Sequence, residues 1–171
     1  TIKNKAIVHT FGVSGASDLC PRYTEIINHK WKLENEISNI NGNKCKKATC
    51  TLFGRNWTAW YSIKHPIPFG PYKFFGLPGL IIKIEDDTQS YKFEVTSIIQ
   101  RNKLYPKEVF EDVFNTTKQK TMQIFENGRF SMASFDGAQM EASVRKKLEE
   151  GARKRKENEN NPIELKPFIY N

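Results

Sequence analysis

The 171-residue sequence lacks several features that would identify a membrane protein or a metalloenzyme. Its apolar runs all fall short of the 18 or more residues that a transmembrane helix needs. The chain has only three histidines, and none has a partner at the His-Glu-x-x-His spacing or another spacing typical of metal ligands. We therefore expect no transmembrane segment, no metal centre and no cofactor.

Motifs that carry catalysis are also missing. No serine lies in a Gly-x-Ser-x-Gly elbow, and no glycine-rich loop suited to a phosphate is present. Cys50 and His65 could act as nucleophile and base, but no local signature supports that pair. Asp86 and Asp87 are neighbours on a predicted turn, so their carboxylates are expected to point apart at a solvated hairpin tip. The sequence therefore predicts no catalytic residue.

Cysteine is scarce, and its use leaves two interpretations open. Cys45 and Cys50 lie on one predicted strand at an offset that places them on opposite faces, about 16 Å apart. A disulfide in an oxidising compartment would therefore join Cys20 to Cys45 or to Cys50. The alternative is that all three are buried thiols that act as small hydrophobic residues.

What is present indicates one globular domain. Hydrophobic residues make up 38% of the chain, aromatic residues 12% and charged residues 27%, which is typical of a folded protein with an ordinary surface. The length suits a single domain with its own core. We expect residues 1–136 to form a β-rich domain that includes the first helix, and residues 137–171 to form a charged C-terminal helix and tail.

Short alternating segments predict a sheet. Apolar and polar side chains alternate in residues 31–38, as in a half-buried strand. Asn41-Gly42 follows, a pair that favours a type I′ hairpin turn. Prolines exclude the connector at residues 66–71 from a central strand. The predicted strands are residues 5–11, 23–29, 31–38, 44–53, 56–63, 80–84 and 91–99.

Two helices are expected after the strands. The first begins near Pro106, and Asn127-Gly128 predicts its end. The second begins after Asp136, has only a narrow apolar seam and is expected to break at Gly151. The predicted fold class is therefore α+β, mostly β: a curved antiparallel sheet of about seven strands, shaped as a sandwich or half-barrel, with two C-terminal helices.

Several sequence words in a fixed order carry a family resemblance. The most distinctive is Gly-Leu-Pro-Gly-Leu-Ile at residues 76–81, where glycine and proline predict a bend that feeds a buried strand. Further words lie at residues 43–49, 55–61, 67–74 and 161–165. In this order they resemble the GLPGLI family, exported cell-envelope proteins of Bacteroidota.

The resemblance, densest over residues 31–99, implies a location but no activity. The family has no established activity, and so it supplies no catalytic residues. Its members are exported, which implies a periplasmic or outer-membrane-associated protein. We expect that a leader is absent from this sequence, because no charged, then apolar, then small-residue segment begins at Thr1.

Aromatic residues are concentrated between residues 57 and 75. Such a cluster could line a groove for a peptide, a sugar or an apolar ligand, because flat rings give a large contact area. The alternative is that most of the rings fill the core. Arg55 would decorate the groove, or would instead stack on a ring or pair with a carboxylate such as Asp86. The candidate ligand-binding residues are Arg55, Trp57, Trp60, Tyr61, Tyr72 and Lys73.

Positive charge exceeds negative charge, with a formal net charge of +8. A solvated helix face is the ordinary explanation of such a charge run, and contact with anionic envelope lipid is an alternative that would make the protein a peripheral membrane binder. Nucleic acid is not expected, because no zinc-finger, RNA-recognition or helix-turn-helix signature is present. Much of the charge lies in and after the second predicted helix, at Arg145, Lys146, Lys147, Arg153, Lys154, Arg155 and Lys156.

Together these features favour a non-catalytic binding or scaffold module of the cell envelope that presents an aromatic surface to a partner protein or an apolar ligand. Two alternatives stay open. One is a basic surface that binds anionic lipid or nucleic acid. The other is a hydrolase-type enzyme whose site is assembled from distant residues such as Arg55, Tyr61, His65 and Asp86.

Overall fold

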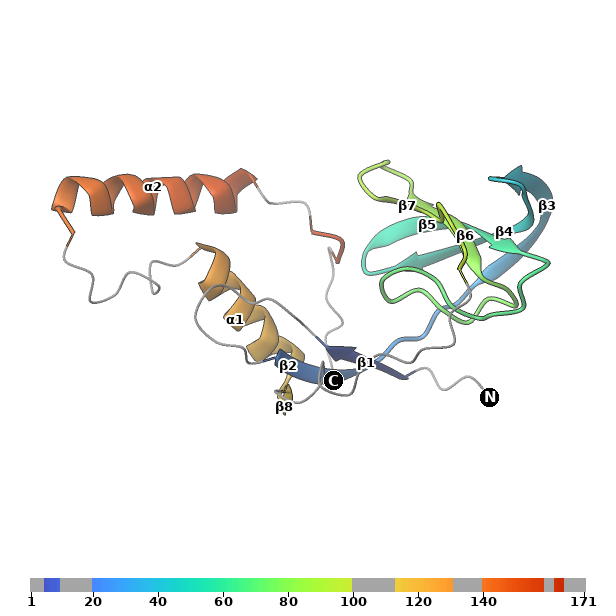
Figure 1. Cartoon of the computed structure of the whole chain (residues 1–171), viewed down its shortest axis with the longest axis horizontal. Helices are drawn as coiled ribbons and strands as arrows, with labels where there is room; N and C mark the ends of the chain where they lie inside the picture. The colour runs from blue at the N-terminus through green and yellow to red at the C-terminus, as the bar shows by residue number, and fades with distance from the viewer. Residues whose placement is uncertain (1–4, 10–19, 100–112, 131–139, 159–161, 165–171) are drawn as a thin grey trace. The chain divides into compact units, whose positions relative to one another are not determined.

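The computed structural model describes residues 5–9, 20–99, 113–130, 140–158 and 162–164. These residues form eight strands and two helices, which confirms the predicted α+β class with mostly β structure. The chain divides into two compact units. The first contains strands β3 to β7 and residues 162–164, and the second contains β1, β2, β8 and both helices (Figure 1). The boundary expected at residue 136 stays a prediction.

The first unit is built on an open, five-stranded antiparallel sheet in the order β3-β4-β5-β6-β7. Each strand predicted in this part of the chain is present. The last is shorter than expected, because residues 95–99 follow it without forming a strand. The strands are β3 (Lys32–Ile40), β4 (Asn43–Leu52), β5 (Arg55–Ser62), β6 (Ile81–Asp86) and β7 (Lys92–Glu94).

Tight turns with positive φ angles join the first three of these strands. Asn41 and Gly42 have φ angles of 49° and 76°, which confirms the turn predicted between β3 and β4. Phe53 and Gly54, with φ angles of 55° and 81°, make an equivalent turn between β4 and β5. A phenylalanine seldom adopts this conformation. The sequence therefore indicated only a bend at Gly54.

One face of the sheet carries the core of the first unit. Alternate residues of β4 and β5 point to this face, and the strand register places Cys50 opposite Trp57 and Ala48 opposite Ala59. The apolar strand β6 lies next to β5 and completes the layer. The largest fully buried apolar side chains of the unit are Ile27, Trp57, Phe74, Leu77, Ile81, Ile82 and Ile84.

The connector between β5 and β6 is tied to itself and to the sheet by backbone hydrogen bonds. The Leu80 N–H donates to the His65 carbonyl at 2.9 Å, and the Gly76 N–H donates to the Pro68 carbonyl at 3.0 Å. The backbone at Gly79 lies close to the backbone of Ser62. Only glycine fits there, because a Cβ at this position would lie 2.0 Å from the carbonyl oxygen of Ser62. The Gly-Leu-Pro-Gly word therefore makes the predicted bend into a buried strand.

The second unit combines a small sheet with the two helices. Strand β2 (Cys20–Ile26) pairs antiparallel with β1 (Lys5–His9) and parallel with β8 (Val113–Asn115). Helix α1 (Lys118–Phe130) contacts both β2 and α2 (Ala142–Asn158). The strands predicted from sequence as one sheet therefore fall into two sheets.

The helix boundaries correct the sequence prediction. Residues 113–115 were expected inside the first helix but form β8, and α1 begins after Thr117, whose Oγ1 accepts the Lys120 N–H at 3.2 Å as a helix cap. Helix α1 continues through Asn127-Gly128, and α2 is unbroken at Gly151. A glycine inside a helix costs only about 1 kcal/mol, which neighbouring turns offset. The expected start near residue 106 lies outside the described residues.

Candidate functional site

The predicted aromatic residues do not share one surface. Trp57 and Tyr61 point to the core face, where their exposed fractions are 1% and 5%. Phe74 packs against Trp57 with ring centroids 4.6 Å apart. Trp60 is half-buried on the opposite face, where Lys47 Nζ lies 5.9 Å from its ring centroid. Of the seven rings between residues 57 and 75, three are therefore buried, whereas Phe69 and Tyr72 are 64% and 48% exposed, so each interpretation describes only part of the cluster.

Arg55 is buried at the start of β5, where it both pairs with a carboxylate and stacks on an aromatic ring, the two contacts predicted as alternatives to a place in the groove. Its Nη1 lies 2.8 Å from Asp86 Oδ2, and its guanidinium lies 5.0 Å from the ring centroid of Tyr91. Asp86 is only 2% exposed, so it does not lie at a solvated tip as expected. Burial would raise the pKa of Asp86, but hydrogen bonds from Thr88, from the Tyr91 backbone and from Arg55 outweigh it and lower that pKa.

The other nitrogens of Arg55 bind a segment from much later in the sequence. We call residues 162–164 the tail segment. Arg55 Nη2 donates to the Pro162 carbonyl at 2.9 Å, and Arg55 Nε donates to the Ile163 carbonyl at 3.2 Å. No local pattern signals this contact, because Pro162 lies 107 residues after Arg55.

The last residue of the tail segment binds two more of the predicted site residues. Lys73 Nζ lies 2.6 Å from Glu164 Oε1, and the two side chains are 5% and 9% exposed. The Tyr72 hydroxyl donates to the same carboxylate. Lys73 also lies 5.5 Å from the ring centroid of Phe53 and 5.3 Å from that of Tyr72. Arg55, Tyr72 and Lys73 thus come together as one site, which we call the tail site.

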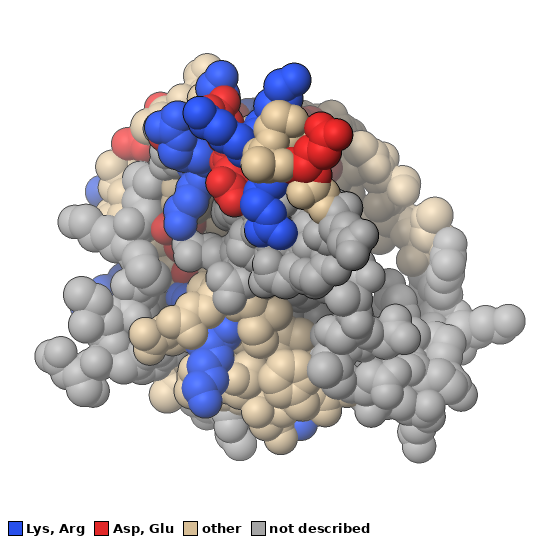
Figure 2. Space-filling view, turned by 90° about the vertical axis from the view of Figure 1, so that its left-hand side faces the viewer, with Lys and Arg blue, Asp and Glu red and all other residues tan. Residues whose placement is uncertain are grey.

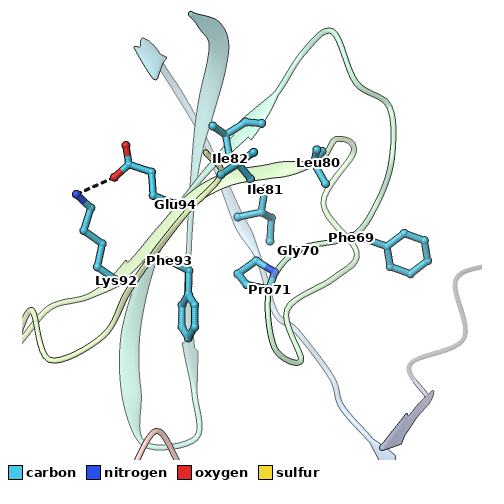
Figure 3. A pocket seen from close by; sticks show the side chains of 10 residues that line it. Phe69, Gly70, Pro71, Leu80, Ile81, Ile82, Lys92, Phe93 and Glu94 are labelled. Carbon is cyan, nitrogen blue, oxygen red and sulfur yellow. Dashed lines mark ion pairs between the residues drawn. The ribbon is translucent and has the colours of Figure 1, made fainter. Parts of the chain in front are cut away.

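An open groove with an apolar lining lies beside β7. Figure 3 shows Lys92 and Glu94 forming an ion pair on one side of the strand, while Phe93 points to the other side. Phe69, at the edge of the lining, is 64% exposed. Sequence reasoning included Phe69 in the aromatic cluster but missed Phe93. We call this site, of about 500 Å³, the apolar groove; it is lined by Phe69, Gly70, Pro71, Leu80, Ile81, Ile82, Lys92, Phe93, Glu94 and Val95.

A second hollow, of about 530 Å³, contains an unusual histidine. The His29 ring stacks on Trp31, with centroids 5.8 Å apart and an interplanar angle of 3°. Burial lowers the pKa of His29 to about 4, although a hydrogen bond with the Lys73 backbone raises it. The imidazole is therefore neutral near pH 7. The hollow is lined by His29, Trp31, Leu33, Pro66, Pro68, Gly76, Leu77 and Pro78.

The two thiols of the first unit are buried and have raised pKa values. Cys45 and Cys50 are buried and free, which agrees with their interpretation as small hydrophobic residues, and burial raises the pKa of Cys50 to about 12. The Cys20 side chain lies outside the described residues, so the disulfide from Cys20 to Cys45 or Cys50 stays a prediction. Within the described ranges, no three His, Cys, Asp or Glu side chains are grouped to bind a metal.

The residues named for a dispersed hydrolase site do not converge on either hollow. Arg55 and Asp86 lie within hydrogen-bond reach of each other, but neither lines the apolar groove or the second hollow. Tyr61 is buried in the core. His65 lies with its Nδ1 3.0 Å from Ser62 Oγ. The ion pair of Arg55 and Asp86 therefore lies outside both hollows and next to the tail segment, which Arg55 also binds.

Helix α2 carries all seven basic residues singled out from the sequence, on a surface that also carries acidic residues. Figure 2 shows acidic side chains among the basic ones on this face. Arg153, for example, lies 3.4 Å from Glu157. The arrangement agrees with a solvated helix, and contact with anionic lipid stays a prediction. The described helices include none with the length and apolar character required to cross a membrane.

Comparison with known proteins gives a family-model match over part of the chain and a similar fold. Residues 54–83 match a family model described as "Protein of unknown function (Porph_ging)". This match spans β5, the connector and the start of β6, and it is consistent with a Bacteroidota family. The GLPGLI name itself stays a prediction. A search of curated proteins finds no match.

Two solved structures of PNGF-II, in space groups P21 and C2, are similar to the chain, with TM-scores of 0.62 and 0.61. Each is 18% identical, and each alignment covers 75% of this chain and 24% of the PNGF-II chain. The chain thus spans about a quarter of the length of these proteins. At this identity the likeness shows the fold alone.

Proposed function

We propose that the protein is a non-catalytic binding module of the cell envelope, and that its apolar groove holds an extended apolar segment of a partner protein. The position of the groove carries this proposal. It lies directly beside β7, which is the last strand of the sheet in the described part of the chain. An apolar surface and an open sheet edge are therefore combined at one place.

The edge strand has backbone groups available for a further strand. Backbone hydrogen bonds direct Tyr91 and Val95 toward β6. Because neighbouring residues of a strand direct their backbone groups to opposite sides, Lys92 and Glu94 direct theirs to the open edge. A partner segment added there pairs as a sixth strand, and its alternate side chains enter the groove beside Phe93.

Charge and location support the same proposal. The two charged side chains at the groove, Lys92 and Glu94, lie 2.7 Å apart and offset each other, so the site favours an apolar occupant over an ion. The envelope location rests on the resemblance to exported proteins of Bacteroidota.

Photo-crosslinking tests the proposal. A photoreactive amino acid at Phe69, which is 64% exposed, should capture one envelope protein, and Phe93→Ser should reduce that capture about tenfold, because the segment loses an aromatic contact. Ile37→Ser is the matched control, since it removes a 50% exposed apolar side chain at the opposite edge strand. Equal capture by folded Phe93→Ser protein would refute the proposal.

A further inference from the structure

The tail site recognises its occupant through two carbonyls and one carboxylate. Arg55 offers two N–H groups from one planar fork to the carbonyls of Pro162 and Ile163. Lys73 and Tyr72 both bind the carboxylate of the next residue, Glu164. Carbonyls are present in every peptide, so the carboxylate at the third position provides the selectivity. The chemistry fits any short acidic peptide that can present two successive carbonyls followed by a carboxylate.

Contacts within the first unit hold this site in shape. Asp86 anchors Arg55 Nη1, and the rings of Phe53 and Tyr72 flank Lys73. Tyr72 has a φ angle of 53°, a left-handed conformation that a tyrosine adopts only where its surroundings impose it. A site that is ordered by its own unit loses little conformational entropy when a peptide binds.

In the sequence, a long stretch that belongs to the second unit separates the tail segment from the rest of the first unit. The chain leaves the first unit at Arg101, forms most of the second unit with residues 102–160 and returns at Asn161. A connection of this length gives the tail a modest effective concentration, so an identical segment from another molecule can compete with it.

We propose that the tail site binds short acidic peptides in trans, and that a second copy of this chain supplies one in the form of its own residues 162–164. This site is separate from the apolar groove, because Arg55, Tyr72 and Lys73 do not line the groove. The two proposals therefore succeed or fail independently.

Two full-length variants that each break one half of the contact test the exchange. Glu164→Gln removes the carboxylate from the tail and keeps the site, whereas Lys73→Met removes the ammonium from the site and keeps the tail. When mixed, they should form a 1:1 complex in native mass spectrometry and sedimentation equilibrium, and each variant alone should not self-associate. Absence of the mixed complex would overturn the second copy as the peptide source. If Lys73→Met does not fold, Tyr72→Phe replaces it.

A peptide probe tests the chemistry of recognition. The labelled peptide Asn-Asn-Pro-Ile-Glu-Leu-Lys should bind the Glu164→Gln chain at least about tenfold more tightly than the wild type, whose site is filled by its own tail. A peptide with Gln in place of Glu should bind at least about tenfold more weakly. Fluorescence anisotropy measures both affinities, and circular dichroism confirms folding. Equal binding by wild type and variant, or by both peptides, would overturn the site.

Discussion

Gly79 has room for a hydrogen atom and nothing larger, since a Cβ would lie 2.0 Å from the backbone oxygen of Ser62. We predict that Gly79→Ala lowers the free energy of unfolding by at least about 2 kcal/mol, measured by urea denaturation, because the backbone must move to relieve the clash. Gly151→Ala is the control. A Cβ there meets nothing within 4 Å, and alanine should stabilise the helix by about 0.5–1 kcal/mol. Similar effects of both changes would contradict the account.

His29 makes stability depend on pH. Burial lowers its pKa to about 4 in the folded chain, against an ordinary value of 6.5, so the unfolded chain takes up the proton first as the pH falls. Stability from this group is complete above pH 6.5 and is lost between pH 6.5 and about 4. We predict that, over this pH range, the free energy of unfolding falls by about 1–2 kcal/mol less in His29→Phe than in the wild type, once solvent screening is taken into account. A pH dependence unchanged by His29→Phe would exclude this role.

Cysteine reactivity tests both interpretations of the thiols. Because burial raises the pKa of Cys50 to about 12, we predict that Cys45 and Cys50 react with iodoacetamide at least about a hundredfold more slowly in the folded chain than in urea. A Cys20→Ser chain restricts the readout to these two thiols. Mass spectrometry of the unreduced wild type decides the disulfide, since three modified thiols exclude it and one modified thiol supports it.

At the scale of elements, the ion pair of Arg55 and Asp86 joins the start of β5 to the end of β6 at 2.8 Å. We predict that Asp86→Asn lowers the free energy of unfolding by about 3 kcal/mol, because it removes the carboxylate that pairs with a buried guanidinium. Asp87→Asn is the matched control. Its carboxylate is exposed, where it accepts a hydrogen bond from Asn56, and its replacement should change stability by less than about 0.5 kcal/mol. A large loss of stability in Asp87→Asn, without one in Asp86→Asn, would contradict this prediction.

The sequence predicted the elements that local pattern decides. Alternation and the Asn41-Gly42 turn were enough for β3, β4 and β5. It failed at β8, because three residues become a strand only by pairing with β2, whose Arg22 aligns with Asn115. The sequence predicted the tail site only in part, because this site also depends on contacts between segments that are far apart in sequence. Arg55, Tyr72 and Lys73 were named as site residues, but the acceptors from residues 162–164 carry no periodicity that points back to them.

At the scale of the whole molecule, both units are discontinuous in sequence. The first takes residues 27–101 and a late return from residue 161, and the second takes residues 5–26 and 102–160. Each unit has an ion pair whose carboxylate is fully buried and that joins segments distant in sequence. Asp86 and Arg55 serve the first, and Lys118 and Glu25, 2.6 Å apart, serve the second.

Hydrogen exchange can separate the two units. Lys118→Met removes an ion-pair partner of the fully buried Glu25 carboxylate, so we predict faster amide exchange in β2 and α1 and unchanged exchange in β5 and β6. Asp86→Asn should give the reverse pattern. Faster exchange throughout the chain in both variants would show instead that the units open as one cooperative body.

The late return of the tail segment sets an order for maturation. Glu164, which neutralises Lys73, lies 91 residues after it. During synthesis the β-sheet unit therefore lacks the Glu164 carboxylate until the 91 residues that follow Lys73 have been added. A product cut short by premature termination or by a protease that cleaves ahead of Pro162 lacks this carboxylate, and quality control can distinguish it from a chain that carries the tail segment.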